Sequence, residues 1–193
     1  MKTKKYKNVL DYYNNATDDY KFWSKNYNMH FGLAIPNVFN REKMLQKMNA
    51  FILASAGFYD LPKANFIDVG CGCGGTLRQG CEENTNGTIL GITFSEWQIE
   101  KSQSLICHKQ LINAKVIKGD YHDLPFNNEV FNGGYALESI CHSEDRNQVL
   151  KEVSRVLKKG SHFIVADGFL KMELKNTSCL FQKMFKILLY RDL

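Results

Sequence analysis

A glycine-rich stretch near the middle of the chain is the first candidate for binding chemistry. Residues 65–75 read NFIDVGCGCGG. Four of the last six residues are glycines, and a short run that is mainly apolar precedes them. Glycine loses more backbone freedom on folding than other residues, so such a run indicates that something approaches the backbone closely. Gly70, Gly72 and Gly75 match G-x-G-x-x-G, and the candidate ligands are a phosphate, a metal and an adenosine-bearing cofactor.

The residues around this turn favour one of the three ligands. A nicotinamide dinucleotide enzyme needs an acid about 20 residues on, at the end of the second strand, where this chain has Thr93. No Gly-Lys-Ser/Thr follows the glycines, and the charge of Asp68 would repel a pyrophosphate. Cys71 and Cys73 form a C-x-C pair without a second pair of ligands, so no metal is predicted. A cofactor with an ammonium group and a sulfonium suits the carboxylate best.

Alternating strands and helices are predicted to position this turn. Short apolar runs predict five strands, at residues 65–70, 87–94, 114–120, 131–137 and 161–169. Capped or amphipathic segments predict helices between them, at residues 76–83, 95–110 and 145–159, with Gly160 as the last C-cap. This order predicts an α/β fold with a parallel sheet covered on both faces. The first sixty or so residues are predicted to be helical and rich in aromatic side chains.

Composition and charge limit the class of protein. The 193 residues suit one domain with a small appendage, and 44% hydrophobic with 23% charged residues are typical of a globular protein. The net charge of +5 is dispersed along the chain, so nucleic acid is not predicted as a partner. No membrane span or signal peptide is recognised, and the six cysteines fit no disulfide framework, which together predict a cytoplasmic protein.

Several linked motifs resemble those of the class I S-adenosylmethionine-dependent methyltransferases. DVGCGCGG at 68–75 resembles the first motif of that family, and GITFSEWQ at 91–98 resembles a variant found among the sterol-, tocopherol- and cyclopropane-forming members. Later motifs follow in the same order, with GDYHDLPF at 119–126, YALESICH at 135–142 and EVSRVLKKG at 152–160. The resemblance implies a Rossmann-like methyltransferase sheet with S-adenosyl-L-methionine as its cofactor.

The resemblance also implies which residues bind the cofactor. They are Asp68, Gly70, Cys71, Gly72, Thr93, Phe94, Gln98, Asp120, Tyr121, Ala136 and Leu137. Asp120 is expected to accept a hydrogen bond from the adenine amino group, and Thr93 and Gln98 are expected to bind the ribose in place of the usual acid. Without the resemblance, Thr93 would be interpreted as a strand-end cap and Gln98 as a solvated helix residue.

Two polar residues after the fourth strand are candidates for catalysis. Glu138 and His142 lie four residues apart, beside the place where the resemblance puts the methyl group. His142 would act as a base or orient the acceptor, and Glu138 would take a proton or stabilise a developing cation. The alternative is that both are structural hydrogen-bond partners. Residues of the N-terminal segment would shape the acceptor pocket or else pack as plain core, and these are Tyr12, Tyr20, Trp23 and His30.

The expected organisation has three parts and an incomplete sheet. Residues 1–60 are predicted to form a helical cap, 61–170 the cofactor-binding core and 171–193 the helical start of an acceptor-covering insertion. The family's sheet continues beyond the fifth strand, so the fold is expected to be truncated there, with an oligomer or a partner chain completing the sheet. The resemblance implies methyl transfer to a small lipophilic or aromatic molecule, such as a terpenoid, sterol or phenol. The alternatives are a cofactor-binding remnant or subunit without activity of its own, and an NAD(P)-dependent oxidoreductase.

Overall fold

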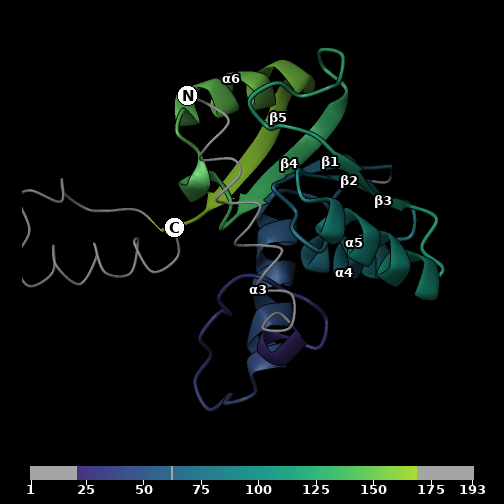
Figure 1. Cartoon of the computed structure of the whole chain (residues 1–193), viewed down its shortest axis with the longest axis vertical. Helices are drawn as coiled ribbons and strands as arrows, with labels where there is room; N and C mark the ends of the chain where they lie inside the picture. Colours follow the sequence, from purple (N-terminus) through teal and green to yellow (C-terminus); the bar gives the residue numbers. More distant parts are fainter. Residues whose placement is uncertain (1–20, 62, 169–193) are drawn as a thin grey trace, which may run out of the picture. The chain divides into compact units, whose positions relative to one another are not determined.

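The computed structural model describes residues 21–61 and 63–168, which contain a five-stranded parallel sheet (Figure 1). The strands are β1 (Asn65–Val69), β2 (Thr88–Thr93), β3 (Ala114–Lys118), β4 (Phe131–Leu137) and β5 (Leu157–Ala166). Their order is β3-β2-β1-β4-β5, and every neighbouring pair is parallel. The predicted α/β fold is therefore confirmed. The strand order reverses between β1 and β4, and ligands of such sheets bind outside the carboxyl ends of the strands at that point.

Helices cover both faces of the sheet. Those that lie wholly within the described residues are α3 (Arg41–Ser55), α4 (Gly75–Glu83), α5 (Glu96–His108), α6 (Arg146–Val156) and a short 3-10 helix, η1 (Ile140–His142). The side chain of Ser95 accepts a hydrogen bond from the Gln98 amide and caps α5, as predicted. In Figure 1, α6 lies on one face of the sheet, and α3, α4 and α5 lie on the other.

Each face of the sheet has its own apolar core, because successive side chains of a strand point to opposite faces. On one face Phe66 and Tyr135 are fully buried among residues of α3, α4 and α5. On the other face Ile67 and Ala136 pack with Val149 and its neighbours on α6. These two cores hold the ends of β1 and β4 side by side, at the place where the glycine turn begins.

The prediction of a helix to residue 159 with Gly160 as its C-cap is wrong. α6 ends at Val156, and β5 begins at the next residue. The N–H of Val130 donates to the carbonyl of Val156 at 2.8 Å, so another segment caps the helix end and no glycine is needed there. Gly160 has a φ of 79° and lies instead in an irregular stretch of β5, where the pairing with β4 shifts register.

The prediction of helix throughout the first sixty residues is also wrong in part. Residues 21–23 and α3 are helical, whereas residues 24–40 contain no helix. Some backbone groups of that stretch bond to side chains instead of to a helical ladder. The Asn28 N–H, for example, donates to the Ser24 side chain at 3.1 Å. Side chains that satisfy backbone groups locally compete with a helical ladder, which explains the irregular path.

The described residues up to Asp167 belong to one compact unit. The described part of the predicted cap therefore lies in the same unit as the sheet. The rest of that cap and the predicted insertion at 171–193 fall outside the described residues. None of the helices in the described part of the chain combines the length and the apolar character that a membrane span requires.

Candidate active site

The glycine turn after β1 is shaped by contacts with two other segments of the protein. Gly70 has a φ of 80°, a left-handed conformation that favours glycine. A Cβ atom on Gly70 would lie 2.5 Å from the Cβ of Ser139, and a Cβ on Gly75 would clash with the Asn28 side chain. Two of the close approaches that the glycines indicate are therefore made by the protein itself.

Gly72 is different, because it contacts a flexible side chain. Its φ is 53°, and a Cβ atom there would have Met29 Sδ as its nearest neighbour, at 3.1 Å. The same sulfur lies 4.0 Å from Nε2 of Gln98. Met29 therefore touches two of the predicted cofactor-binding residues, although no sequence signal pointed to it. An unbranched thioether fills such a space without fixing its shape, so it can shift for a ligand.

Asp68 lies under this turn as the penultimate residue of β1. Its side chain is buried, and burial raises the pKa of the carboxyl to about 7, against a smaller opposing effect of the Tyr135 hydroxyl. That hydroxyl makes no hydrogen bond of ordinary length within the described residues. No lysine or arginine of the described chain forms an ion pair with Asp68. A cationic ligand beside this carboxyl would therefore stabilise its charged form.

Thr93 and Gln98 are brought together at the end of β2. The Thr93 hydroxyl donates to Gln98 Oε1 at 2.5 Å, and both side chains are buried. Gln98 is thus not a solvated helix residue. Because the hydroxyl donates to the amide oxygen, the oxygen of Thr93 can accept and the Nε2 group of Gln98 can donate, as a ribose diol requires. Phe94, the next residue along, is half-buried at the same edge.

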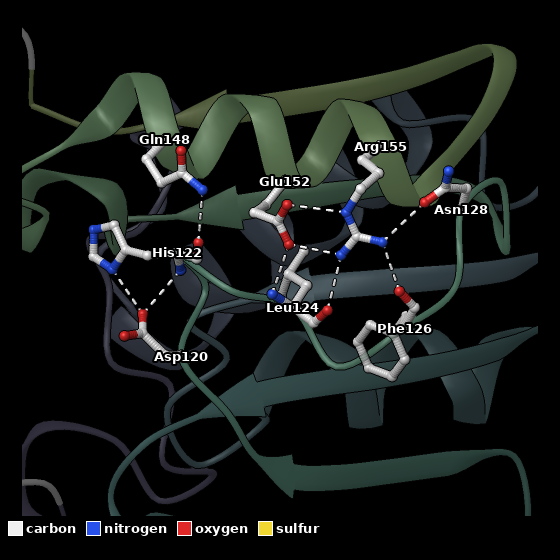
Figure 2. Close-up of polar contacts among 8 residues, drawn as sticks. All are labelled: Asp120, His122, Leu124, Phe126, Asn128, Gln148, Glu152 and Arg155. Carbon is white, nitrogen blue, oxygen red and sulfur yellow. Dashed lines mark hydrogen bonds and ion pairs between the residues drawn. The ribbon is translucent and has the colours of Figure 1, made fainter.

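Asp120 follows β3 and is held by its neighbour in the chain. Asp120 Oδ1 accepts hydrogen bonds from the backbone N–H and from Nδ1 of His122, at 2.9 and 2.7 Å (Figure 2). His122 Nε2 lies 2.8 Å from the Ser143 hydroxyl, which follows η1. The Tyr121 ring contacts the His122 ring in a tilted arrangement, with the ring centroids 4.8 Å apart and the ring planes at 60°. The structure therefore ties the loop after β3 to the segment after β4, through a histidine that sequence reasoning missed.

The Asp120–His122–Ser143 series has the order of groups that activates serine nucleophiles. Ser143 is buried, however, and its oxygen also accepts a hydrogen bond from the Asp145 N–H at 3.1 Å. A hydroxyl that is enclosed and already bonded cannot approach a substrate. We therefore interpret the series as a cross-link between two loops.

Glu138 lies directly after β4, where Ala136 and Leu137 end the strand in buried positions. Its φ of 49° is uncommon for a residue other than glycine, and such strain occurs often at functional sites. Its carboxylate accepts a hydrogen bond from the Phe31 N–H at 2.8 Å. Burial raises the pKa of Glu138, the Phe31 N–H lowers it, and the charge of Asp167 raises it. The structure thus connects Glu138 to the N-terminal segment.

His142 lies on the surface at the end of η1, four residues beyond Glu138. Its backbone N–H donates to the Ser139 carbonyl at 3.4 Å. Ser139 is also the residue that packs against Gly70, and its hydroxyl donates to the Val69 carbonyl at 2.6 Å. The segment that carries both catalytic candidates is therefore attached to the glycine turn.

Of the predicted acceptor-pocket residues, Trp23 and His30 are described, while Tyr12 and Tyr20 lie outside the described residues. The rings of Trp23 and Phe31 meet edge to face, with centroids 6.0 Å apart. His30 is buried, and burial lowers its pKa, so its ring is neutral near pH 7. Its Nδ1 donates to the Phe31 carbonyl at 2.9 Å, and Nε2 makes no hydrogen bond of ordinary length within the described residues.

The two cysteines of the turn are free thiols. Burial raises the pKa of Cys73 to about 12, and the pKa of Cys71 is also raised by its burial. A thiol with a raised pKa is a poor nucleophile near neutral pH, because the thiolate is the reactive form.

The fold and this set of residues define a class of protein. The parallel sheet carries a glycine turn after β1, a hydroxyl–amide pair that begins at the end of β2, and an acid after β3. All three lie at the carboxyl ends of the strands, where open α/β sheets bind their ligands. The buried carboxyl of Asp68 fits a cofactor that carries positive charge. An acid at the end of β2, which a nicotinamide cofactor needs, is absent, since Thr93 stands there.

Comparison with known proteins identifies the family. Residues 60–190 match the model of a methyltransferase domain family, so this chain belongs to that family. The chain is 35% identical over 152 residues to the O-methyltransferase resE of Aspergillus sclerotiorum, a match that covers 76% of this chain and 54% of the relative. It is 29% identical over 160 residues to 24-methylenesterol C-methyltransferase 2 of Arabidopsis thaliana, covering 81% of this chain and 42% of the relative.

A solved structure shows the same fold. Geranyl diphosphate C-methyltransferase of Streptomyces coelicolor A3(2) superposes with a TM-score of 0.80 at 17% sequence identity, covering 97% of this chain and 74% of the other. The predicted class I S-adenosylmethionine-dependent methyltransferase family and its cofactor are thus confirmed, and no comparison supports an oxidoreductase. The chain spans about half the length of the curated relatives that it matches.

Proposed function

We propose that this chain binds S-adenosyl-L-methionine and transfers its methyl group to a small lipophilic molecule. The observation that carries the proposal is the buried carboxyl of Asp68 beside the glycine turn, next to a hydroxyl–amide pair that matches a ribose diol. A pyrophosphate would be repelled by this carboxylate, whereas a ligand with an ammonium group would be attracted by it.

Each binding residue has a separate task in this proposal. Asp68 and Gly72 would lie along the methionine part of the cofactor, with Met29 moving aside from Gly72. Thr93 and Gln98 would bind the ribose diol. Asp120 would accept from the adenine amino group while His122 holds its carboxylate in place. The backbone N–H of the residue after Asp120 would meet the adenine ring, and Ala136 and Leu137 would present carbonyl oxygens to the ammonium group.

When bound, the cofactor supplies a methyl group on a sulfonium, which is already a good leaving group. The chain therefore mainly has to position the acceptor, and positioning can lower a barrier by roughly 7–11 kcal/mol. Glu138 is fixed by the Phe31 N–H, and burial raises its pKa, which makes its carboxylate a stronger base. His142, on the surface nearby, would orient the acceptor or serve as a second base.

The acceptor class follows from the N-terminal segment and from the relatives. Phe31 donates its backbone N–H to Glu138, and its ring meets that of Trp23 edge to face, next to the neutral His30 in the chain. Aromatic faces bind apolar molecules and can stabilise a cation that develops on carbon. The sterol C-methyltransferases among the relatives support an acceptor of terpenoid or sterol type, and the O-methyltransferases support a phenol.

Two measurements test the proposal. Calorimetry with S-adenosylhomocysteine should show binding to the chain, and an NAD(P) titration should show none. A turnover assay with labelled methyl donor should then yield product with at least one member of a panel of sterols, terpenoids and phenols. Failure to bind S-adenosylhomocysteine would refute the cofactor site, and binding without turnover would refute the enzyme.

A second candidate function is a cofactor-binding subunit that needs a partner for activity. Among the described residues β5 pairs with β4 alone, and Phe163 and Val165 remain only half-buried. Pairing of this edge with a second strand would satisfy its backbone groups. Sedimentation of the chain alone would distinguish a monomer from an oligomer.

The proposed setting is the cytoplasm, where the five unpaired thiols among the described residues would stay reduced.

A further inference from the structure

A clamp on α6 holds the loop between β3 and β4 (residues 119–130), which carries Asp120. At its centre is Arg155, whose guanidinium uses Nε and both terminal nitrogens (Figure 2). Nη1 donates to the Phe126 carbonyl at 2.7 Å and to Asn128 Oδ1 at 3.1 Å. Nη2 donates to the Leu124 carbonyl at 2.9 Å. One side chain therefore binds three positions of the loop.

Glu152 completes the clamp. Its Oε1 accepts from Nε of Arg155 at 2.9 Å and its Oε2 accepts from Nη2 at 2.6 Å, which is a bidentate ion pair. Oε2 also accepts from the Leu124 N–H at 2.8 Å, so the pair holds both backbone groups of Leu124. The hydrogen bond from Arg155 lowers the pKa of Glu152, which keeps the pair charged at neutral pH.

The clamp continues along the same face of α6 to Asp120. Gln148 Nε2 donates to the His122 carbonyl at 3.0 Å, and His122 in turn donates twice to Asp120 Oδ1. Gln148, Glu152 and Arg155 are four and three residues apart, so they lie on one side of the helix. A continuous series of hydrogen bonds thus runs from α6 to the carboxylate that the proposed function assigns to adenine (Figure 2).

Backbone hydrogen bonds fix the two ends of the loop, and the clamp holds its middle. The Gly119 N–H donates to the Thr93 carbonyl at 3.0 Å, and the Glu129 and Val130 N–H groups donate to the carbonyls of Arg155 and Val156. Between these ends the backbone bonds are local, since the Asp123 N–H donates to the Asp120 carbonyl and the Phe126 N–H donates to the Leu124 carbonyl. Such turns fix the shape of this part of the loop but not its position relative to α6. An exposed ion pair adds little to stability, but a guanidinium with several fixed acceptors specifies geometry.

We propose that Arg155 and Glu152 are positioning residues for the adenine end of the cofactor. The inference rests on the proposed function, since it assigns Asp120 to the adenine amino group. The pair sets the position of the loop so that the Asp120 carboxylate meets that amino group at hydrogen-bond distance. A lysine at position 155 cannot replace the arginine, because a single ammonium group does not present the planar fork that reaches these acceptors.

The test compares two ligands, S-adenosylhomocysteine and its purine analogue without the 6-amino group. The wild-type chain should bind S-adenosylhomocysteine with roughly tenfold or more higher affinity than the analogue, because a hydrogen bond to a charged group contributes that much to binding. Arg155→Lys should lower affinity for S-adenosylhomocysteine by roughly tenfold but leave affinity for the analogue within about threefold, so that the preference is lost. Arg146→Lys is the matched control, because Arg146 lies on the same helix and, within the part of the chain that the structure describes, its guanidinium donates to the Cys141 carbonyl alone, at 3.5 Å.

Hydrogen exchange supplies a readout that needs no ligand. The Leu124 amide should exchange faster in Arg155→Lys and in the milder variant Glu152→Gln, and at the wild-type rate in Arg146→Lys. Equal losses for both ligands in Arg155→Lys, or an unchanged preference, would overturn the inference while the proposed function stands. A wild-type chain that binds neither ligand would overturn the proposed function itself, and with it this role of the clamp.

Discussion

Replacing Asp68 by asparagine should remove a pH dependence from the stability of the protein. The carboxyl has a pKa of about 7 in the folded chain, against an ordinary value of 3.8. Between these pH values the folded state holds a proton that the unfolded state has lost, so the free energy of unfolding falls as pH rises. The decrease is complete above the folded pKa, and the rise from 3.8 to about 7 corresponds to roughly 4 kcal/mol.

The assay is urea unfolding at several pH values from 4 to 8. Because other groups also titrate in this range, the quantity to compare is the difference between the free energies of unfolding of the wild type and Asp68→Asn. That difference should move by roughly 4 kcal/mol in favour of the variant as pH rises. Asp60→Asn is the control, since it makes the same change of side chain at an exposed aspartate.

The same carboxyl should report on the ligand. A cationic group beside Asp68 favours its charged form, so S-adenosylhomocysteine should release a proton on binding below pH 7. Calorimetry at pH 6 in buffers of different ionisation enthalpy measures that proton directly. In the urea assay, a difference in the free energy of unfolding between the wild type and Asp68→Asn that does not change with pH would refute the argument that burial raises the pKa of Asp68. Binding without proton release would show that Asp68 does not face the ammonium group.

Three further substitutions and one control test other parts of the structure. Gly70→Ala should lower the free energy of unfolding by roughly 2–4 kcal/mol in the same urea assay, because the new Cβ clashes with Ser139. Gly160→Ala is its control and should cost about 1 kcal/mol, because Gly160 has a similar φ but open space around it. Asp120→Ala should weaken S-adenosylhomocysteine binding by roughly 1–3 kcal/mol in calorimetry, and unchanged affinity would disprove the adenine assignment. Glu138→Gln should keep that affinity but lower turnover by roughly a hundredfold, and full turnover would leave this residue a structural role only.

The order of strands and helices could be predicted because it is a local property of the sequence. Apolar runs of strand length and the glycine turn marked β1 to β4 within a few residues. The end of α6 could not be predicted, because the Val130 N–H that caps Val156 comes from a segment distant in the sequence. The path of residues 24–40 was missed for a different reason, since local bonds to side chains, such as that of the Asn28 N–H to Ser24, replace part of a helical ladder there.

The residues of the candidate site also differ in whether the sequence alone could predict them. Thr93, Gln98 and Asp120 were identified because their motifs are short and contiguous, and the structure pairs the first two. Met29 and His122 were missed because their roles exist only through contacts across the fold. A histidine two residues after the acid was the available signal for His122. For Met29 no comparable signal exists in the sequence.

The glycine turn is best understood as a junction of three segments rather than as a simple cradle. Gly70 admits Ser139 from the end of β4, and Gly75 admits Asn28 from the N-terminal segment, so both glycines serve packing. Gly72 faces the unbranched, flexible side chain of Met29. A cofactor that displaces Met29 would therefore act on the N-terminal segment, which also donates to Glu138 through Phe31. One short segment, residues 28–31, thus contacts both the turn and the proposed base.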